Sequence, residues 1–458
     1  MDVQDKAATA APREPPKRES SKYRKAAALA LLLILALGAA WAGIKISRIN
    51  ASVATIQGLG GTVHVVHNPN LAGSTVLRGL SLATGNNQVQ VRWSGPQVTD
   101  AELCRLKAFS QLQEVRLADA AISDQGLDLL SGRKELRHLS LAGSPITDDG
   151  AAKLCGLTEL ESLCLSRTRV GDAGLAQLHG SAGLRILELA NTTVTDAGME
   201  AIAAFTNLGH LDLSGTTVTD AGLKHLSRLS SMRNLKLAGT RVGDAGMEHL
   251  KGLAGLGSLD LSATGVTDAG VGLLQGLRGL CDVDLGNTKV ADATLALFGD
   301  LPHLHRLILR GTRVTDNGLA HLKRKSDDPR VVDLRWLDLA STRVTDAGMK
   351  CLQQFIIGDL DLSANALGDA GLQCLSGVRG LTGLHLRGTR ITDAGLEHLQ
   401  RKTGLLRLDF ADTAVTDSGL ACLVKLTNLE SLNLKGTRVT EEGVKKFSEA
   451  VPRCKVAK

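Results

Sequence analysis

Aromatic residues are scarce in this chain of 458 residues, which holds one Tyr, three Trp and six Phe. Tyr and Trp dominate the hot spots of tight protein interfaces, so their scarcity argues against one deep, high-affinity site. The eight cysteines are dispersed, and no two lie closer than nine residues, which excludes a C-x-x-C metal or redox motif. Cys351 and Cys374 share one position in consecutive copies of a repeat, and a disulfide and unpaired thiols remain open alternatives.

Short motifs of catalysis and cofactor binding are also absent. The sequence has no Gly-Lys dipeptide, and so no P-loop, and no His-Glu dipeptide, and so no H-E-x-x-H zinc site. It also has no G-x-S-x-G nucleophile elbow. We therefore expect a protein that is not an enzyme and that binds no cofactor or metal.

One phrase recurs fifteen times, and its clearest copy runs from Leu235 to Met247. Its acidic residue returns every 24 residues, except for a step of 30 into Asp346 and a step of 23 into Asp369. A fixed period of this length indicates stacked supersecondary units in place of one globular core.

Each unit is expected to combine a short strand with a helix. Leu235 and Leu237 alternate with Lys236, which is typical of a short strand with one buried face. Apolar residues at helical spacing begin at Met247. Asp244 precedes this run, and we interpret it as the helix N-cap. A Gly such as Gly246 follows most of these Asp residues by two positions and is expected to let adjacent helices approach closely, although Thr294 breaks this pattern.

The pattern Leu-x-x-Leu-x-Leu followed by a small polar residue resembles the leucine-rich repeat family. Thr fills the polar position in most units, whereas Asn365 and Ser144 fill it in two. Val218-Thr219-Asp220 and its counterparts resemble the cysteine-containing subclass common in F-box proteins, although this chain has Thr in place of Cys and a shorter period. The resemblance implies an α/β fold, a leucine-rich repeat solenoid curved like a horseshoe. Its parallel sheet lies on the concave face and its helices on the convex face.

The sequence predicts four segments. Residues 1–25 form a basic, disordered cytoplasmic tail, and residues 26–44 form a transmembrane helix that acts as a signal anchor. Residues 45–88 form a juxtamembrane segment and N-terminal cap, and residues 89–458 form a leucine-rich repeat domain of about fifteen repeats.

Residues 26–44 carry no charge and would span roughly 28 Å as a helix, close to the thickness of membrane hydrocarbon. Five basic residues precede this run between residues 17 and 25. The positive-inside rule therefore predicts a single-pass membrane protein with its N-terminus in the cytoplasm and its repeats outside. The alternative is secretion after cleavage of a signal peptide, because Ala40-Trp41-Ala42 resembles a cleavage site.

The net charge of +6 is unevenly placed, since residues 1–48 carry +5 and the remaining chain +1. The positive net charge therefore comes almost entirely from the N-terminal segment and does not indicate a basic surface on the repeats. We expect no nucleic-acid partner.

Stacking turns each repeat position into a column, with neighbouring strands about 4.8 Å apart. The strand residue between the two leucines should face the concave side. Neighbouring carboxylates there repel by on the order of 1 kcal/mol in water, so an acidic column predicts a basic partner. A solvated face that only keeps the protein soluble is the alternative. Seven of fourteen such positions are acidic, namely Glu188, Asp212, Asp260, Asp284, Asp338, Asp361 and Asp409.

A basic column follows the Thr of the repeat. We expect it along the rim where strands turn toward helices, partly neutralising the acidic residues nearby. Its members are Arg169, Arg241, Lys289, Arg313, Arg343, Arg390 and Arg438.

Three segments depart from the repeat. Residues 63–66 and 76–80 are expected to be strands of an N-terminal cap. Residues 452–456 are expected to form a final strand edge, and residues 323–330 an insertion that projects from the convex side or an edge.

These patterns predict a non-catalytic, membrane-anchored interaction scaffold with a monomeric ectodomain, which binds a protein partner on its concave face. The F-box resemblance implies an alternative, the substrate-recognition subunit of an SCF-type ubiquitin ligase. We expect no F-box before the repeats, because the predicted membrane anchor occupies its place. The sequence does not identify the partner.

Overall fold

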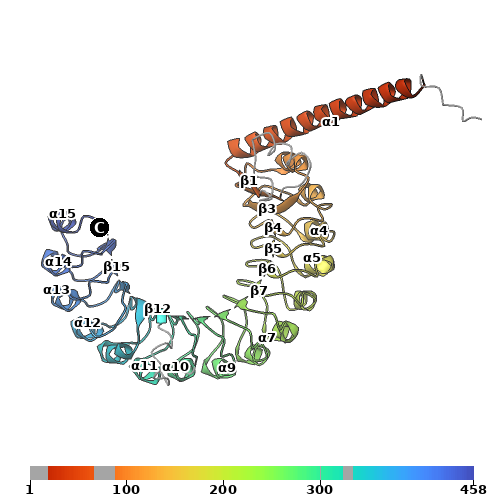
Figure 1. Ribbon diagram of the computed structural model, residues 1–458. Coiled ribbons are helices and arrows are strands. Elements are labelled where there is room, and N and C mark those ends of the chain that lie inside the picture. Colours follow the sequence, from red (N-terminus) through yellow and green to blue (C-terminus); the bar gives the residue numbers. More distant parts are fainter. Residues whose placement is uncertain (1–18, 67–87, 300, 323–333) are drawn as a thin grey trace, which may run out of the picture. The chain divides into compact units, whose positions relative to one another are not determined.

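The computed structural model of the chain consists of two compact units (Figure 1). Unit 1 comprises residues 1–91 and 105–112, and unit 2 comprises residues 92–104 and 113–458. For residues 19–32, 34 and 35 the structure describes the backbone and not the side chains. The structure describes residues 19–66, 88–299, 301–322 and 334–458.

Unit 1 contains one long helix, α1 (Glu19–Gly58). The predicted membrane span, residues 26–44, lies within α1. No helix among the described residues is long and apolar enough to cross a membrane, so the structure does not support the expected transmembrane helix. Residues 19–25, predicted to be disordered, are helical, because their Glu, Lys and Arg residues favour a helix and continue into the one that follows.

The end of α1 packs on β1 (Thr62–Val66), and Ile49 and Ile56 of the helix are buried. β1 confirms the strand predicted at residues 63–66. The strand predicted at residues 76–80 lies outside the described residues.

Unit 2 is built on short parallel strands, one for each repeat. Neighbouring strands pair in register, so that Ser258 lies opposite Asp282 and Arg306 lies opposite Trp336. The longer and shorter repeats keep this register, since Trp336 lies opposite Asp359. The strands are β2 (Gln88–Ser94), of which residues 88–91 belong to unit 1, β3 (Leu112–Ala118), of which Leu112 belongs to unit 1, β4 (His138–Ser140), β5 (Ser162–Cys164), β6 (Ile186–Glu188), β7 (His210–Asp212), β8 (Asn234–Lys236), β9 (Ser258–Asp260), β10 (Asp282–Asp284), β11 (Arg306–Ile308), β12 (Leu334–Asp338), β13 (Ile357–Asp361), β14 (Gly383–His385), β15 (Arg407–Asp409), β16 (Ser431–Asn433) and β17 (Lys455–Ala457).

Short helical segments follow the strands. Within unit 2 the strands line the inner side and the helical segments the outer side (Figure 1). The α-helices are α3 (Asp100–Leu103), α4 (Asp148–Ala152), α5 (Asp172–Ala176), α6 (Gly198–Ile202), α7 (Asp220–Leu223), α8 (Asp244–Met247), α9 (Asp268–Gly272), α10 (Asp292–Phe298), α11 (Asp316–His321), α12 (Asp369–Leu375), α13 (Asp393–Leu396), α14 (Asp417–Leu423) and α15 (Glu441–Ala450). The 3-10 helices are η2 (Cys104–Ala108), η3 (Asp124–Leu129), η4 (Gln177–Gly180), η5 (Lys224–Arg228), η6 (Asp346–Gln354) and η7 (Glu397–Leu399).

The core of unit 2 lies between the strands and the helical segments. Leu235, Leu237 and Met247 are fully buried, whereas Lys236 between the leucines is partly exposed. The alternation predicted for the strand is therefore confirmed. The buried leucines of each repeat pack against those of its neighbours and form a continuous core that no single repeat could form alone.

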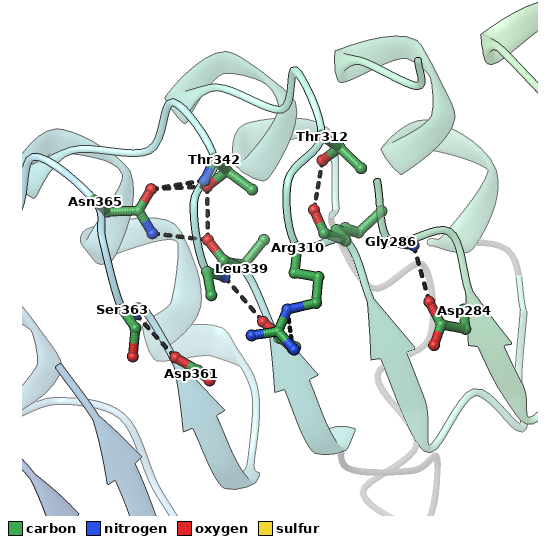
Figure 2. A network of polar contacts seen from close by, with 12 residues as sticks. Asp284, Gly286, Arg310, Thr312, Leu339, Thr342, Asp361, Ser363 and Asn365 are labelled. Carbon is green, nitrogen blue, oxygen red and sulfur yellow. Dashed lines mark hydrogen bonds and ion pairs between the residues drawn. The ribbon is translucent and has the colours of Figure 1, made fainter. Parts of the chain in front are cut away.

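Each strand from β2 to β16 is followed by a tight turn that contains a left-handed residue. Gly239 has φ 65°, and Ala263 occupies the same position one repeat later with φ 54°. The next residue is the small polar one of the repeat, and Thr240 Oγ1 donates a hydrogen bond of 2.6 Å to the Leu237 carbonyl. Asn365 also ties repeats together, because its Oδ1 accepts a 3.0 Å bond from the Thr342 backbone N–H (Figure 2).

The interpretation of the repeated Asp as a helix N-cap is wrong. Asp268 is the first residue of α9, and the cap is Thr267, whose side chain accepts a hydrogen bond from the Ala269 N–H. Asp and Thr are both good cap residues, so the pair Thr-Asp left two choices, and the Asp side chains turn instead toward the next repeat. The predicted close approach at the glycine is present, since a Cβ on Gly270 would lie 2.4 Å from Asp244 Oδ1.

The two remaining segments outside the repeat have different outcomes. β17 confirms a final strand and lies at residues 455–457, slightly beyond the expected position. It pairs in parallel with β16. The insertion at residues 323–330 lies outside the described residues.

Candidate binding surface

The seven acidic residues predicted to form a column all occupy the third position of a three-residue strand motif. Strand pairing places them in one row along the sheet, Glu188 opposite Asp212 and Asp338 opposite Asp361. Lys236, Ile308 and His385 occupy the row's other positions from β8 to β15. We call the side chains at the first and third positions of β4 to β16 the strand face.

Part of the preference for Asp in this column is structural. Asp284 Oδ1 accepts a hydrogen bond of 2.8 Å from the Gly286 N–H, and Asp361 Oδ1 accepts one of 2.9 Å from the Ser363 N–H (Figure 2). The side chain thereby satisfies a backbone donor where the strand ends, as Asp does in turns. The second oxygen of each carboxylate is not needed for this bond.

Few basic side chains balance the column. Lys236 Nζ lies 3.6 Å from Asp212 Oδ2, and Arg310 Nε lies 3.6 Å from Asp338 Oδ2. Among the described residues no cation pairs with Asp260, Asp284, Asp361 or Asp409. The part of the strand face from β9 to β15 therefore carries uncompensated negative charge.

Burial of this charge raises the affinity of two carboxylates for protons. The pKa of Asp284 is raised from 3.8 to about 6, with loss of solvent as the largest cause. The neighbouring Asp260 and Asp338 contribute to the rise, and the Gly286 N–H and Arg306 act against it. Burial likewise raises the pKa of Asp338, which is 4% exposed, and Asp361 adds to that rise. Desolvation and like charge are the physical causes in both cases.

The seven basic residues predicted for the rim are all exposed. None of them forms an ion pair with a described carboxylate, so the expected neutralisation of the acidic column does not come from them. Lys236 and Arg310, which lie close to the column, supply it instead. The rim side chains extend into solvent, where charges gain little from pairing.

Sequence reasoning missed the first strand position, which lies on the same face as the third because side chains alternate along a strand. Trp336 occupies it on β12, between Arg306 on β11 and Asp359 on β13. The Trp336 and His385 rings lie 6.3 Å apart between centroids, with 39° between their planes. A Trp at a surface strand position in a chain so poor in aromatics was the available signal.

A polar hollow occupies the other end of the strand face. It is lined by side chains that include Arg116, His138, Cys164 and Glu188. Burial raises the pKa of the Cys164 thiol, and a hydrogen bond with Glu188 raises it further. The thiol therefore stays protonated at neutral pH and is a poor nucleophile.

The cysteines do not form the suggested crosslink. All eight are free thiols, including Cys351 and Cys374. The structure thus corresponds to the alternative of unpaired thiols.

The repeats match known proteins at the level of family and fold. A family model described as Leucine Rich repeat matches residues 135–155, 183–203, 206–227, 359–376 and 425–448. No curated protein matches the chain.

Solved structures of leucine-rich repeat proteins are similar to this chain. A leucine-rich repeat protein of Leptospira interrogans is 17% identical, with a TM-score of 0.51, and the match covers 77% of this chain and 92% of that one. An internalin of Listeria monocytogenes is 20% identical, with a TM-score of 0.47 and coverage of 72% and 82%. The plant peptide hormone receptor RGFR1 in complex with RGF2 is 12% identical, with a TM-score of 0.38 and coverage of 77% and 67%.

This chain contains leucine-rich repeats, and its unit 2 has a solenoid-like leucine-rich repeat fold.

Proposed function

We propose that the protein is a non-catalytic scaffold that binds a protein partner through its strand face. The observation that carries this proposal is the row of carboxylates from Asp260 to Asp409, four of which have no cationic partner among the described residues. An extended sheet face with a net negative charge suits a large, complementary surface better than a small substrate.

The charge of the face favours a basic partner. Complementary charge raises the rate of encounter and selects among partners more than it raises affinity. Binding should therefore weaken as salt screens the carboxylates. The resemblance to F-box-associated repeats supports a narrower alternative, a ubiquitin-ligase substrate receptor.

Crosslinking in intact cells followed by mass spectrometry identifies the partner and the face that it contacts. A five-fold variant replaces Asp by Asn in the column, which keeps an acceptor for the backbone N–H groups and removes the charge. We expect the captured partner to associate more slowly with this variant, and the salt dependence to shrink. The positions are Asp260, Asp284, Asp338, Asp361 and Asp409.

A control variant removes three exposed acids from the helical side, in Glu200→Gln, Glu248→Gln and Glu397→Gln. This control should bind the partner as the parent does. If the five-fold variant binds as fast as the parent and shows no salt dependence, the partner uses another surface. Recovery of ubiquitin-ligase adaptors would favour the substrate-receptor alternative.

The location of the protein is a separate proposal, which sequence alone supports. We infer an anchor at residues 26–44, because basic residues precede an uncharged run there, with the repeats outside the cytoplasm. Protease added to sealed cells should then digest the repeats and leave a small membrane-bound fragment. Repeats that stay protected until lysis would contradict this topology, and a mature N-terminus at Gly43 would indicate a cleaved signal peptide.

A further inference from the structure

The aromatic pair on the strand face spans three neighbouring strands. Trp336 belongs to β12 and His385 to β14, so their 6.3 Å separation means that both rings lean over β13. The Arg306 guanidinium lies 6.0 Å from the Trp336 ring centre. Trp336, His385 and the carboxylates of β12 and β13 thus lie in one patch of the sheet.

Two polar atoms of this pair are buried without a hydrogen-bond partner in the described part of the chain. They are the indole Nε1 of Trp336 and the Nε2 of His385. A buried donor without an acceptor costs free energy, and the great majority of such groups in folded proteins are satisfied. A bound molecule with a carbonyl oxygen would recover this cost at Trp336.

Basic side chains close to the pair are already engaged. Arg407 Nη2 donates to both oxygens of Asp359, at 2.7 and 2.9 Å. It reaches across Gly383, where a Cβ would lie only 1.8 Å from Asp359 Oδ1. Arg306 lies 3.7 Å from Asp282.

The carboxylates beside the pair are not neutralised to the same extent. Asp361 lies opposite both Asp338 and His385 in the strand register and has no cationic partner among the described residues. Among the described residues, Arg310 forms an ion pair with Asp338, with Nε 3.6 Å from Oδ2. The patch thus combines aromatic rings with surplus negative charge, the surroundings that a guanidinium prefers.

We propose that β12 to β14 form an anchor site for an arginine side chain of an extended, basic protein segment. Trp336 and His385 form its aromatic wall, Asp361 and Asp338 supply the opposite charge, and the indole N–H binds a carbonyl of the segment. This inference rests on the proposed function, because it names the chemistry of the partner at the same strand face. Arginine fits better than lysine, since its planar guanidinium both stacks on rings and forms paired bonds with carboxylates.

The test uses the full chain and two labelled dodecapeptides, one alternating arginine with serine and one alternating citrulline with serine. Citrulline keeps the shape of arginine and lacks its charge. Fluorescence anisotropy should show that the arginine peptide binds the parent at least tenfold more tightly than the citrulline peptide.

Variants then locate the site. Trp336→Ala should weaken binding of the arginine peptide by tenfold or more, and Asp361→Asn by several-fold. Trp336→Phe keeps a ring, loses the N–H and should bind with intermediate affinity, which guards against a folding defect in the alanine variant. Ile186→Ala alters an exposed residue at the equivalent position of β6 and should bind as the parent does.

Three outcomes would overturn the inference. They are equal binding of both peptides, parent-like binding by the Trp336 and Asp361 variants, and an equal loss in Ile186→Ala. If the arginine peptide fails while a captured partner still crosslinks to the strand face, the anchor site is wrong and the proposed scaffold function stands. Crosslinks confined to the helical side would remove the proposed function itself.

Discussion

The Asp244 carboxylate accepts hydrogen bonds from the backbone N–H and the hydroxyl of Thr267 in the following repeat, at 2.7 and 2.6 Å. Thr267 in turn caps α9 by accepting a bond from the Ala269 N–H at 3.2 Å. The same arrangement recurs between Asp393 and Thr416. Because each repeat of a solenoid contacts only its neighbours, bonds of this kind carry stability from one repeat to the next.

Asp244→Ala should lower the free energy of unfolding by about 1–3 kcal/mol, because it leaves the Thr267 N–H and hydroxyl without their acceptor. Asp244→Asn keeps one carbonyl oxygen and should cost less. Urea denaturation followed by circular dichroism measures both. Glu248→Ala is the control, since this exposed residue forms a surface ion pair with Lys251 and its loss should cost less than about 1 kcal/mol. Equal losses in Asp244→Ala and Glu248→Ala would contradict the role assigned to the carboxylate.

The repeat and its buried positions could be predicted from sequence because the hydrophobic effect acts on every copy alike. Leu235 and Leu237 alternate with Lys236, and only a strand with one buried face accommodates that order. Fifteen sequence copies with the same spacing also indicate clearly that consecutive repeats stack on one another. The 30-residue and 23-residue steps are absorbed between strands, as the pairing of Arg306, Trp336 and Asp359 shows.

The direction in which a polar side chain points was harder to predict. Thr267 and Asp268 can each cap a helix, and only the packing of the next repeat decides that the Thr does so. Trp336 was missed because the prediction considered one position of the strand face and omitted the other. Which basic side chains neutralise the acidic column also depends on whether they lie close enough to it. Arg310 approaches Asp338, whereas the rim residue Arg313 does not.

The two sides of a strand should respond very differently to substitution. Leu237→Asp places an unpaired carboxylate in the core and should unfold the repeats around it, because buried charge without a partner is costly. Lys236→Gln removes only the contact with Asp212 on the strand face and should change the stability by less than about 1 kcal/mol. Thermal unfolding compares the two. Similar losses of stability from both substitutions would contradict the assignment of Leu237 to the core and of Lys236 to the strand face.

The stability of unit 2 should depend on pH through Asp284. Its pKa is raised from 3.8 to about 6, mainly by burial, so the folded state binds a proton at a higher pH than the unfolded chain does. The folded state therefore holds more protons across this window, and the contribution of Asp284 to stability falls as pH rises from about 4 to about 6. Above pH 6 the ionised carboxylate destabilises the fold relative to a neutral side chain.

Asp284→Asn should consequently raise the melting temperature at about pH 7.5 and have a smaller effect at about pH 4.5. The difference between the variant and the parent isolates Asp284, because all other titratable groups are common to both proteins. Calorimetry at the two pH values measures the difference. A variant less stable than the parent at neutral pH, or one whose advantage grows on acidification, would show that burial does not penalise the charge of Asp284.

The left-handed turn after each strand provides the last prediction. Ala263 holds φ 54° at a position where Gly239 and Gly311 stand in other repeats. A left-handed conformation costs a residue with a Cβ about 1–2 kcal/mol, and glycine avoids that cost while losing about 0.5–1 kcal/mol through the greater freedom of the unfolded chain. Ala263→Gly should therefore stabilise the protein by up to about 1.5 kcal/mol in urea denaturation. Ala238→Gly is the control, because Ala238 lies outside the left-handed region and its replacement should destabilise by about 0.5–1 kcal/mol. If both substitutions destabilise equally, the strain assigned to Ala263 is absent.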